Sequence, residues 1–180
     1  MNTRARTLLA IDVDGVLNGL DGPQPDDHRV AVQVENDHGV FTVRFDPRVI
    51  DRVNALTQAG LVDLTWVTTW GRAARDTLAP AIGLDAGSAV LEDPNDTRLA
   101  RHPYDPARPW WKLDLVLGSL RDDPDRPVAW AEDDLDDATR RRFPDLHPGP
   151  SLLIAPDPGI GLTLQDVDRV EAFARRHVAD

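Results

Sequence analysis

The chain has 180 residues, with 31 acidic side chains against 20 basic ones, 41% apolar residues and no cysteine. This length and apolar share suit a single domain with its own core and exclude a wholly disordered chain. The net charge of −11 disfavours an extended nucleic-acid-binding face, which needs clustered positive charge, and the lack of cysteine excludes a disulfide, a zinc–thiolate site and a thiol nucleophile.

The first apolar run of the chain, Leu8–Ile11, is short and ends at Asp12. It does not have the length of a signal-peptide core or of a membrane span. We therefore expect a cytoplasmic protein that makes no contact with a membrane.

Five short apolar runs have the composition of buried strands. None of them alternates cleanly between apolar and polar residues, which is typical of strands covered on both faces of a parallel sheet. The predicted strands are Thr7–Ile11, Asp63–Val67, Ser88–Leu91, Val128–Ala131 and Ser151–Ala155.

Helical patterns separate most of these strands. The clearest helix has Asp46 as its N-cap, Pro47 in its first turn and Gly60 as its stop signal. The other predicted helices cover Arg72–Ile82, Lys112–Leu120, Asp136–Arg142 and Leu164–Val178. This alternation predicts an α/β fold, a doubly wound, Rossmann-like and mainly parallel five-stranded sheet with helices on both faces. Active sites in such sheets lie beyond the carboxyl ends of the strands.

Residues 28–45 alternate between apolar and polar side chains, as an antiparallel hairpin does. Folding the segment about residues 36–39 aligns three apolar pairs on one face, namely Val30–Phe45, Val32–Val43 and Val34–Phe41. The hairpin lies between the first predicted strand and the first predicted helix. It can therefore lie as a flap over the strand ends or pack elsewhere on the domain.

Two carboxylates, Asp12 and Asp14, come directly after the first predicted strand. Their repulsion is costly unless a cation or a chemical role accompanies them, and the alternative is a plain acidic turn. Two hydroxyls, Thr68 and Thr69, follow the second strand beside a predicted helix start. Hydroxyl and free backbone N–H groups there suit an anion, although such residues are also common helix caps.

A second acidic group, Glu132, Asp133 and Asp134, follows the fourth predicted strand. Carboxylates at a strand end suit a hard cation such as Mg²⁺, and the alternative use is to cap the next helix. The only lysine of the chain, Lys112, stands at the start of the third predicted helix.

The order of these motifs resembles the haloacid dehalogenase-like (HAD) phosphohydrolase superfamily. The motifs are Asp-x-Asp-Gly from Asp12, then Thr68, then Lys112, then the acidic group at Asp133. Three further segments, residues 66–71, 128–135 and 157–163, look like the bacterial HAD domains of "Swiss Army Knife" RNA repair proteins.

The resemblance implies a role for each motif. Asp12 is then the nucleophile that forms an aspartyl-phosphate, and Asp14 is the general acid and later the base for water. Thr68 binds the phosphoryl oxygens, with Thr69 as the alternative. Lys112 holds both Asp12 and the phosphate.

The resemblance also implies a Mg²⁺ site formed by the Asp12 side chain, the Asp14 carbonyl and Asp133. Whether Glu132, Asp134 or Asp137 assists the metal stays open. The motif separations leave no room for a large cap domain, so we expect one capless domain over residues 1–180 with the 28–45 hairpin inserted.

Trp70, Trp110 and Trp111 flank the predicted site in the sequence. They can stack on an aromatic or nucleobase substrate, or they can pack in the core, which is the commoner use of tryptophan.

These observations predict a Mg²⁺-dependent phosphomonoesterase. Its substrate is a phosphorylated small molecule or a nucleic-acid end. Two alternatives remain, a nucleic-acid end-processing phosphatase of the RNA repair type and a non-catalytic module that binds a phospho-ligand or a partner. The resemblance favours the first alternative, and the net charge disfavours it.

Overall fold

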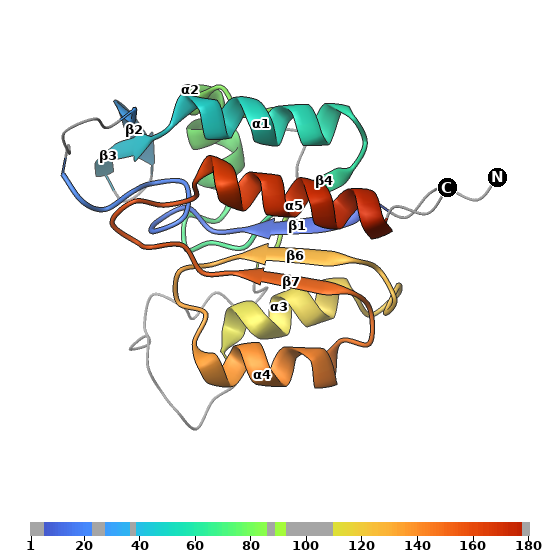
Figure 1. Ribbon diagram of the computed structural model, residues 1–180. Helices are drawn as coiled ribbons and strands as arrows, with labels where there is room; N and C mark the ends of the chain where they lie inside the picture. Colours follow the sequence, from blue (N-terminus) through green and yellow to red (C-terminus); the bar gives the residue numbers. More distant parts are fainter. Residues whose placement is uncertain (1–5, 23–27, 37–38, 86–88, 93–109, 178–180) are drawn as a thin grey trace.

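A parallel sheet of five strands forms the centre of the protein (Figure 1). The computed structural model describes residues 6–22, 28–36, 39–85, 89–92 and 110–177. The strand order is β5-β4-β1-β6-β7, and every neighbouring pair is parallel. The strands are β1 (Thr7–Ile11), β4 (Val62–Trp66), β5 (Ala89–Val90), β6 (Val128–Ala131) and β7 (Ser151–Ile154). The predicted α/β architecture is confirmed, with strand ends within one residue of those predicted; Ser88, the predicted start of the third strand, lies outside the described residues.

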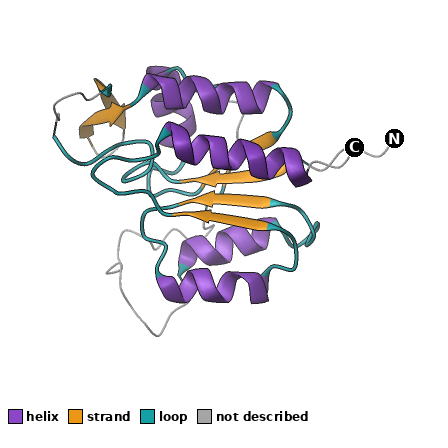
Figure 2. Cartoon of the chain, viewed as in Figure 1, coloured by secondary structure: helices purple, strands orange, loops and turns teal. Residues whose placement is uncertain are grey.

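Helices cover both faces of the sheet (Figures 1 and 2). One face carries α1 (Pro47–Gln58), α2 (Ala79–Ile82) and α5 (Leu164–His177), and the other carries α3 (Trp111–Ser119) and α4 (Asp137–Leu146). Among the described residues, no helix has both the length and the apolar character needed to cross a membrane.

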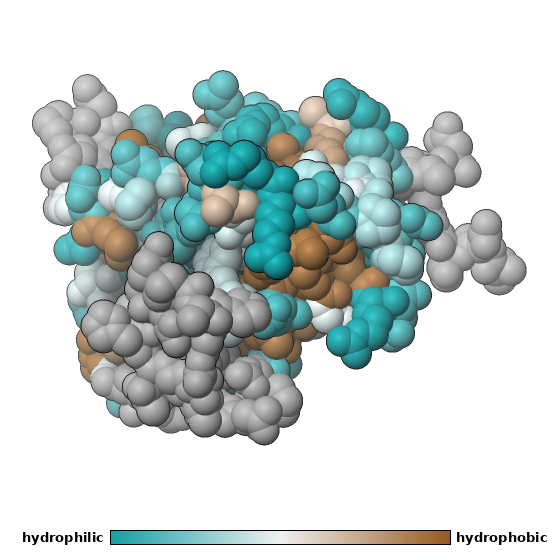
Figure 3. All heavy atoms as spheres, turned by 90° about the horizontal axis from the view of Figure 1, so that it is seen from below, coloured by the Kyte–Doolittle hydropathy of each residue, from teal (hydrophilic) through white to brown (hydrophobic). Residues whose placement is uncertain are grey.

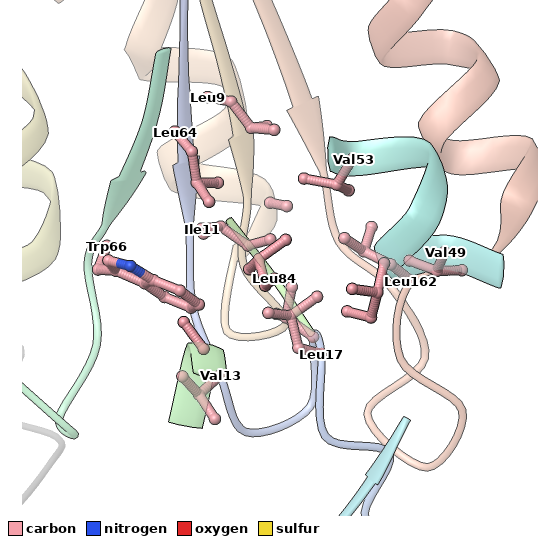
Figure 4. Packing of buried hydrophobic residues seen from close by; sticks show 14 of the residues in the cluster. Leu9, Ile11, Val13, Leu17, Val49, Val53, Leu64, Trp66, Leu84 and Leu162 are labelled. Carbon is pink, nitrogen blue, oxygen red and sulfur yellow. The ribbon is translucent and has the colours of Figure 1, made fainter. Parts of the chain in front are cut away.

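Side chains of β1 pack into two separate hydrophobic clusters, one on each face of the sheet. Leu9 and Ile11 pack under α1 and α5 in the larger cluster (Figure 4), whereas Leu8 and Ala10 pack against α3 and α4 in the smaller one. Successive strand residues point to opposite faces, so a strand covered on both sides is apolar throughout. This packing explains why the sequence of β1 shows no alternation.

The helix predicted over Arg72–Ile82 contains a π-helical turn, η1 (Ala74–Leu78), directly before α2. Pro80 follows this turn and has no backbone N–H to donate to the preceding turn, and the Ala79 N–H donates to the Ala74 carbonyl, five residues back. The helix predicted to end at Arg142 continues to Leu146 through Pro144. The hydrogen bond that Pro144 lacks involves the carbonyl of Arg140, which is an exposed residue that water can reach.

The predicted hairpin is confirmed and lies between β1 and α1. It consists of β2 (Val30–Asn36) and β3 (Gly39–Phe45), paired in the predicted register. Val34, Val43 and Phe45 are buried in the larger core, so the hairpin is anchored to the domain. In Figure 1 it lies on the side to which the arrowheads of β1, β6 and β7 point, away from both chain termini.

Candidate active site at the carboxyl edge of the sheet

The turn after β1 presents Asp12 at the carboxyl edge of the sheet. The Asp12 backbone N–H donates to the Ala131 carbonyl at 3.2 Å, which continues the β1–β6 pairing by one residue. The Asp12 side chain is buried, and its Oδ1 accepts from the Val13 backbone N–H at 2.6 Å. Gly15 turns the chain with a φ of +72°, and its N–H donates to the Asn18 carbonyl at 2.9 Å. The Asp12 carboxylate is therefore held through Oδ1, and its second oxygen, Oδ2, is left for another partner.

Lys112 meets that second oxygen. Its Nζ lies 2.5 Å from Asp12 Oδ2 and 2.7 Å from Glu132 Oε2, and all three side chains are buried. Burial alone lowers the pKa of an ammonium, but the charges of Asp12 and Glu132 outweigh that effect and raise the pKa of Lys112. The lysine is therefore a fixed cation at the strand ends, 100 positions along the chain from Asp12.

Glu132 and Asp133 extend β6 into the same region. Burial, followed by the charge of Asp12, raises the pKa of Glu132 to about 8. Burial, followed by the charges of Asp134 and Asp12, also raises the pKa of Asp133. One oxygen from each of Asp12, Glu132 and Asp133 lies within 4.8 Å of the others. The site thus concentrates more negative charge than one lysine offsets.

The other acidic candidates lie outside this cluster. Asp134 and Asp137 are exposed, and Asp136 accepts from the Thr139 N–H at 2.6 Å as the N-cap of α4. The Asp14 carboxylate is not part of the cluster either, and it has two hydrogen-bond donors of its own. Its Oδ1 accepts from Asn18 Nδ2 at 2.8 Å and its Oδ2 from Trp70 Nε1 at 2.9 Å.

The two threonines after β4 differ in exposure. Thr68 is fully buried, and its Oγ1 accepts from the Trp70 N–H at 3.2 Å, whereas Thr69 is exposed. Trp66, two residues before Thr68, pairs with Ile11, the residue before Asp12. The sheet therefore places Thr68 beside the Asp12 turn.

The tryptophans near the site have different environments. Trp110 stacks on the buried Trp130 at 5.1 Å between ring centroids, which is the core-packing use. The Lys112 Nζ lies 5.9 Å from the Trp110 ring and 5.7 Å from that of Trp111. Trp70 is buried, and its indole donates to Asp14. The sequence marked Trp70 as a flanking residue but contained no signal for that hydrogen bond, nor for the matching one from Asn18.

A cleft of about 430 Å³ lies elsewhere, between α3 and the end of α4, and includes Leu117, Arg121 and Leu146. Figure 3 views the molecule from this side and shows apolar side chains among polar ones. The cleft contains none of the predicted site residues. The cleft is therefore a different part of the surface from the candidate active site at the carboxyl edge of the sheet.

A family model described as "HAD domain in Swiss Army Knife RNA repair proteins" matches residues 8–167. The match begins in β1 and ends in α5, so it includes every residue of the cluster described above. No curated protein and no solved structure matches the chain.

Proposed function

Because the chain belongs to the family of HAD domains in Swiss Army Knife RNA repair proteins, and so to a hydrolase superfamily, we propose that it is a magnesium-dependent phosphomonoesterase. The reaction proceeds through an aspartyl-phosphate on Asp12. The observation that carries this proposal is the buried ion pair between Lys112 Nζ and Asp12 Oδ2.

Electrostatics explains why this ion pair matters. A phosphate monoester is a dianion, and a carboxylate repels it strongly in a site of low dielectric constant. Lys112 offsets that repulsion at the oxygen it touches, and its position at the start of α3 keeps it fixed before substrate arrives. Preorganised charge of this kind supports a nucleophilic role for Asp12.

The remaining residues complete two displacements. An Asp12 oxygen attacks phosphorus, the ester P–O bond breaks, and its electron pair leaves on the alcohol oxygen, which takes a proton from Asp14. Water then attacks the phosphorus of the aspartyl-phosphate and gives its proton to Asp14, while the P–O bond to Asp12 breaks; inorganic phosphate is released and the Asp12 carboxylate is restored. Thr68, buried beside the Asp12 turn, is the proposed hydroxyl donor to the phosphoryl oxygens, in preference to the exposed Thr69.

The donor set fits a hard divalent cation. With all groups ionised, Asp12, Glu132 and Asp133 carry three negative charges against one positive charge on Lys112, and only oxygen ligands are present. Both oxygens of Glu132 and both oxygens of Asp12 already accept hydrogen bonds, so hydrogen bonding does not distinguish the two as ligands. We assign Mg²⁺ to Asp12, Asp133 and the Asp14 carbonyl, the set that the HAD resemblance implies, with Glu132 as the second partner of Lys112. Bound Mg²⁺ supplies positive charge for the phosphoryl oxygens.

A phosphorylated RNA end is the second candidate substrate. The description of the matching family, which names RNA repair, favours it. The net charge of −11 restricts the contact to the terminal nucleotides, since a long strand needs clustered positive charge. Under this hypothesis the protein removes a terminal phosphate without binding the body of the RNA.

A phosphomonoester panel tests the proposal. The wild-type chain is assayed for phosphate release with and without Mg²⁺ on small monoesters and on oligoribonucleotides with a 3′- or a 5′-phosphate. We expect Mg²⁺-dependent turnover that Asp12→Asn abolishes and that Asp51→Asn, at an exposed position of α1, leaves intact. Turnover that survives Asp12→Asn, or a wild-type chain inactive on the whole panel, refutes the proposal. A rate on one RNA end well above that on all small esters identifies the second candidate.

A further inference from the structure

Two hydrogen bonds fix the carboxyl group of Asp14. Asn18 Nδ2 donates to one oxygen at 2.8 Å, and Trp70 Nε1 donates to the other at 2.9 Å. Asn18 and Trp70 are both buried. Rotation of the carboxyl group breaks at least one of these bonds, so its plane has one preferred orientation.

Residues of strand β3 contact both donor residues, Asn18 and Trp70. The Arg44 N–H donates to Asn18 Oδ1 at 2.9 Å, and the Gly19 N–H donates to the Arg44 carbonyl at 2.8 Å. Nearer the hairpin turn, the Phe41 ring packs on the Trp70 ring with 5.3 Å between centroids. Strand β3 therefore supports both hydrogen-bond donors of Asp14, Asn18 through the Arg44 backbone and Trp70 through the Phe41 ring.

The hairpin can act as a support because it is itself anchored. Val34, Val43 and Phe45 are buried in the larger core, and β2 packs on η1 and α2. A hairpin that buries three large apolar side chains does not swing open at low cost. The β2–β3 hairpin is thus anchored to the domain beside the site and can support the side chains that touch it.

We propose that Asn18 and Trp70 are positioning residues for proton transfer by Asp14, and that β3 holds them in place. This inference rests on the proposed function, in which Asp14 protonates the leaving oxygen as the ester bond breaks. Proton transfer requires the carboxyl group within hydrogen-bond reach of that oxygen. A fixed orientation keeps it there, whereas a freely rotating carboxyl group spends much of its time misdirected.

The leaving group provides the test. An alkyl phosphate releases a strongly basic alkoxide that needs the proton, whereas p-nitrophenyl phosphate releases a stable phenolate that hardly does. Trp70→Phe keeps an aromatic ring against Phe41 but removes the N–H. We expect it to lower kcat/KM for an alkyl phosphate about 10- to 100-fold, part of a typical acid–base contribution. We expect kcat/KM for p-nitrophenyl phosphate to change less than about 3-fold. This constant covers the steps up to formation of the aspartyl-phosphate, in which nucleophile and phosphate binding are untouched, and leaves out the later attack of water, in which Asp14 is the base for both esters.

Trp130→Phe is the matched control. Trp130 is fully buried, and its indole N–H has no hydrogen-bond partner among the described residues. This variant loses the same atoms from a packed core, so it should leave the alkyl-to-aryl ratio of kcat/KM unchanged. Asn18→Ala removes the other donor and should lower the ratio in the same direction as Trp70→Phe.

A second measurement reports the hydrogen bond without any activity. In a ¹H–¹⁵N spectrum the Trp70 indole N–H is identified by its loss in Trp70→Phe, and Asp14→Ala should shift it upfield while the Trp130 signal stays in place. Equal loss of kcat/KM on both esters in Trp70→Phe, or no loss on either, overturns the positioning role. A wild-type chain inactive on both esters and on the oligoribonucleotides of the panel instead overturns the proposed function.

Discussion

Glu132→Gln should stabilise the metal-free protein at alkaline pH and have little effect near pH 5. Glu132 is fully buried between Lys112 and the backbone N–H of Asp134. Glutamine keeps the shape of the side chain and removes its charge. The variant therefore measures the cost of an ionised carboxylate at this position.

The magnitude follows from the pKa of Glu132. Burial and the charge of Asp12 raise this pKa from the ordinary 4.5 to about 8. Between these two pH values the unfolded chain has lost a proton that the native chain keeps, so the free energy of unfolding falls as the pH rises. At about 1.4 kcal/mol for each unit of pKa, the fall has an upper bound of about 5 kcal/mol. Water entering the site relaxes part of this cost, and we expect on the order of 2–3 kcal/mol.

Urea unfolding with EDTA, followed by tryptophan fluorescence from pH 5 to pH 9, measures the effect. The quantity of interest is the difference in unfolding free energy between Glu132→Gln and wild type, which should grow with pH up to about 8 and then level off. His147 has a pKa lowered mainly by burial, and taking the difference cancels its opposite contribution below pH 6.5. Glu35→Gln, at an exposed position of β2, should show no such trend. A Glu132→Gln difference that is constant across the pH range refutes the reasoning.

Three further predictions concern the cation and the turn after β1. Mg²⁺ at pH 8 and at 100 times the Kd of the wild type should stabilise the wild type by about 2.7 kcal/mol in urea unfolding. At the same Mg²⁺ concentration Asp133→Asn should lose most of this gain. Stabilisation of equal size in the variant argues against the assigned ligands. Lys112→Arg should lower kcat/KM at least about 100-fold, since a planar guanidinium does not fit a site for a compact ammonium, and near-wild-type turnover contradicts the assigned role. Gly15→Ala should lower the free energy of unfolding by about 1–3 kcal/mol, because the φ of Gly15 is +72° and an added Cβ would lie 2.3 Å from Asp133 Oδ2. Thermal or urea unfolding measures this change. The control Gly118→Ala on α3, where the space is open, should be neutral or stabilising.

The sheet could be predicted because its signal is local. Runs buried on both faces, an N-cap at Asp46 and turn residues each act within a few positions, and the hairpin register followed from alternation alone. The π-helical turn before Pro80 could not be predicted in the same way. It depends on how the chain redistributes hydrogen bonds around a proline, which sequence periodicity does not encode.

The candidate site also has a part that the sequence predicts and a part that it does not. Strand ends and motif order identified Asp12, Lys112 and Asp133 as neighbours, because parallel strands bring their carboxyl ends to one edge. The roles of Glu132 and Trp70 depend on side-chain directions over 20 and 56 positions of sequence, respectively. The sequence leaves open whether Glu132 assists the metal or caps the next helix, and the hydrogen bond that it accepts from Lys112 gives it a third use, that of an anchor for the ammonium.

That anchor explains why a chain with 19 arginines has a lysine at position 112. The ammonium donates to Asp12 at 2.5 Å and to Glu132 at 2.7 Å, and it lies 5.9 Å and 5.7 Å from the ring centroids of Trp110 and Trp111, respectively. An ammonium has three N–H groups, and two carboxylates use two of them. Under the proposed function the third serves a phosphoryl oxygen. A guanidinium spreads its charge over a plane and directs its donors in a fixed fork. It therefore cannot meet two converging carboxylates and still present a compact charge to the substrate.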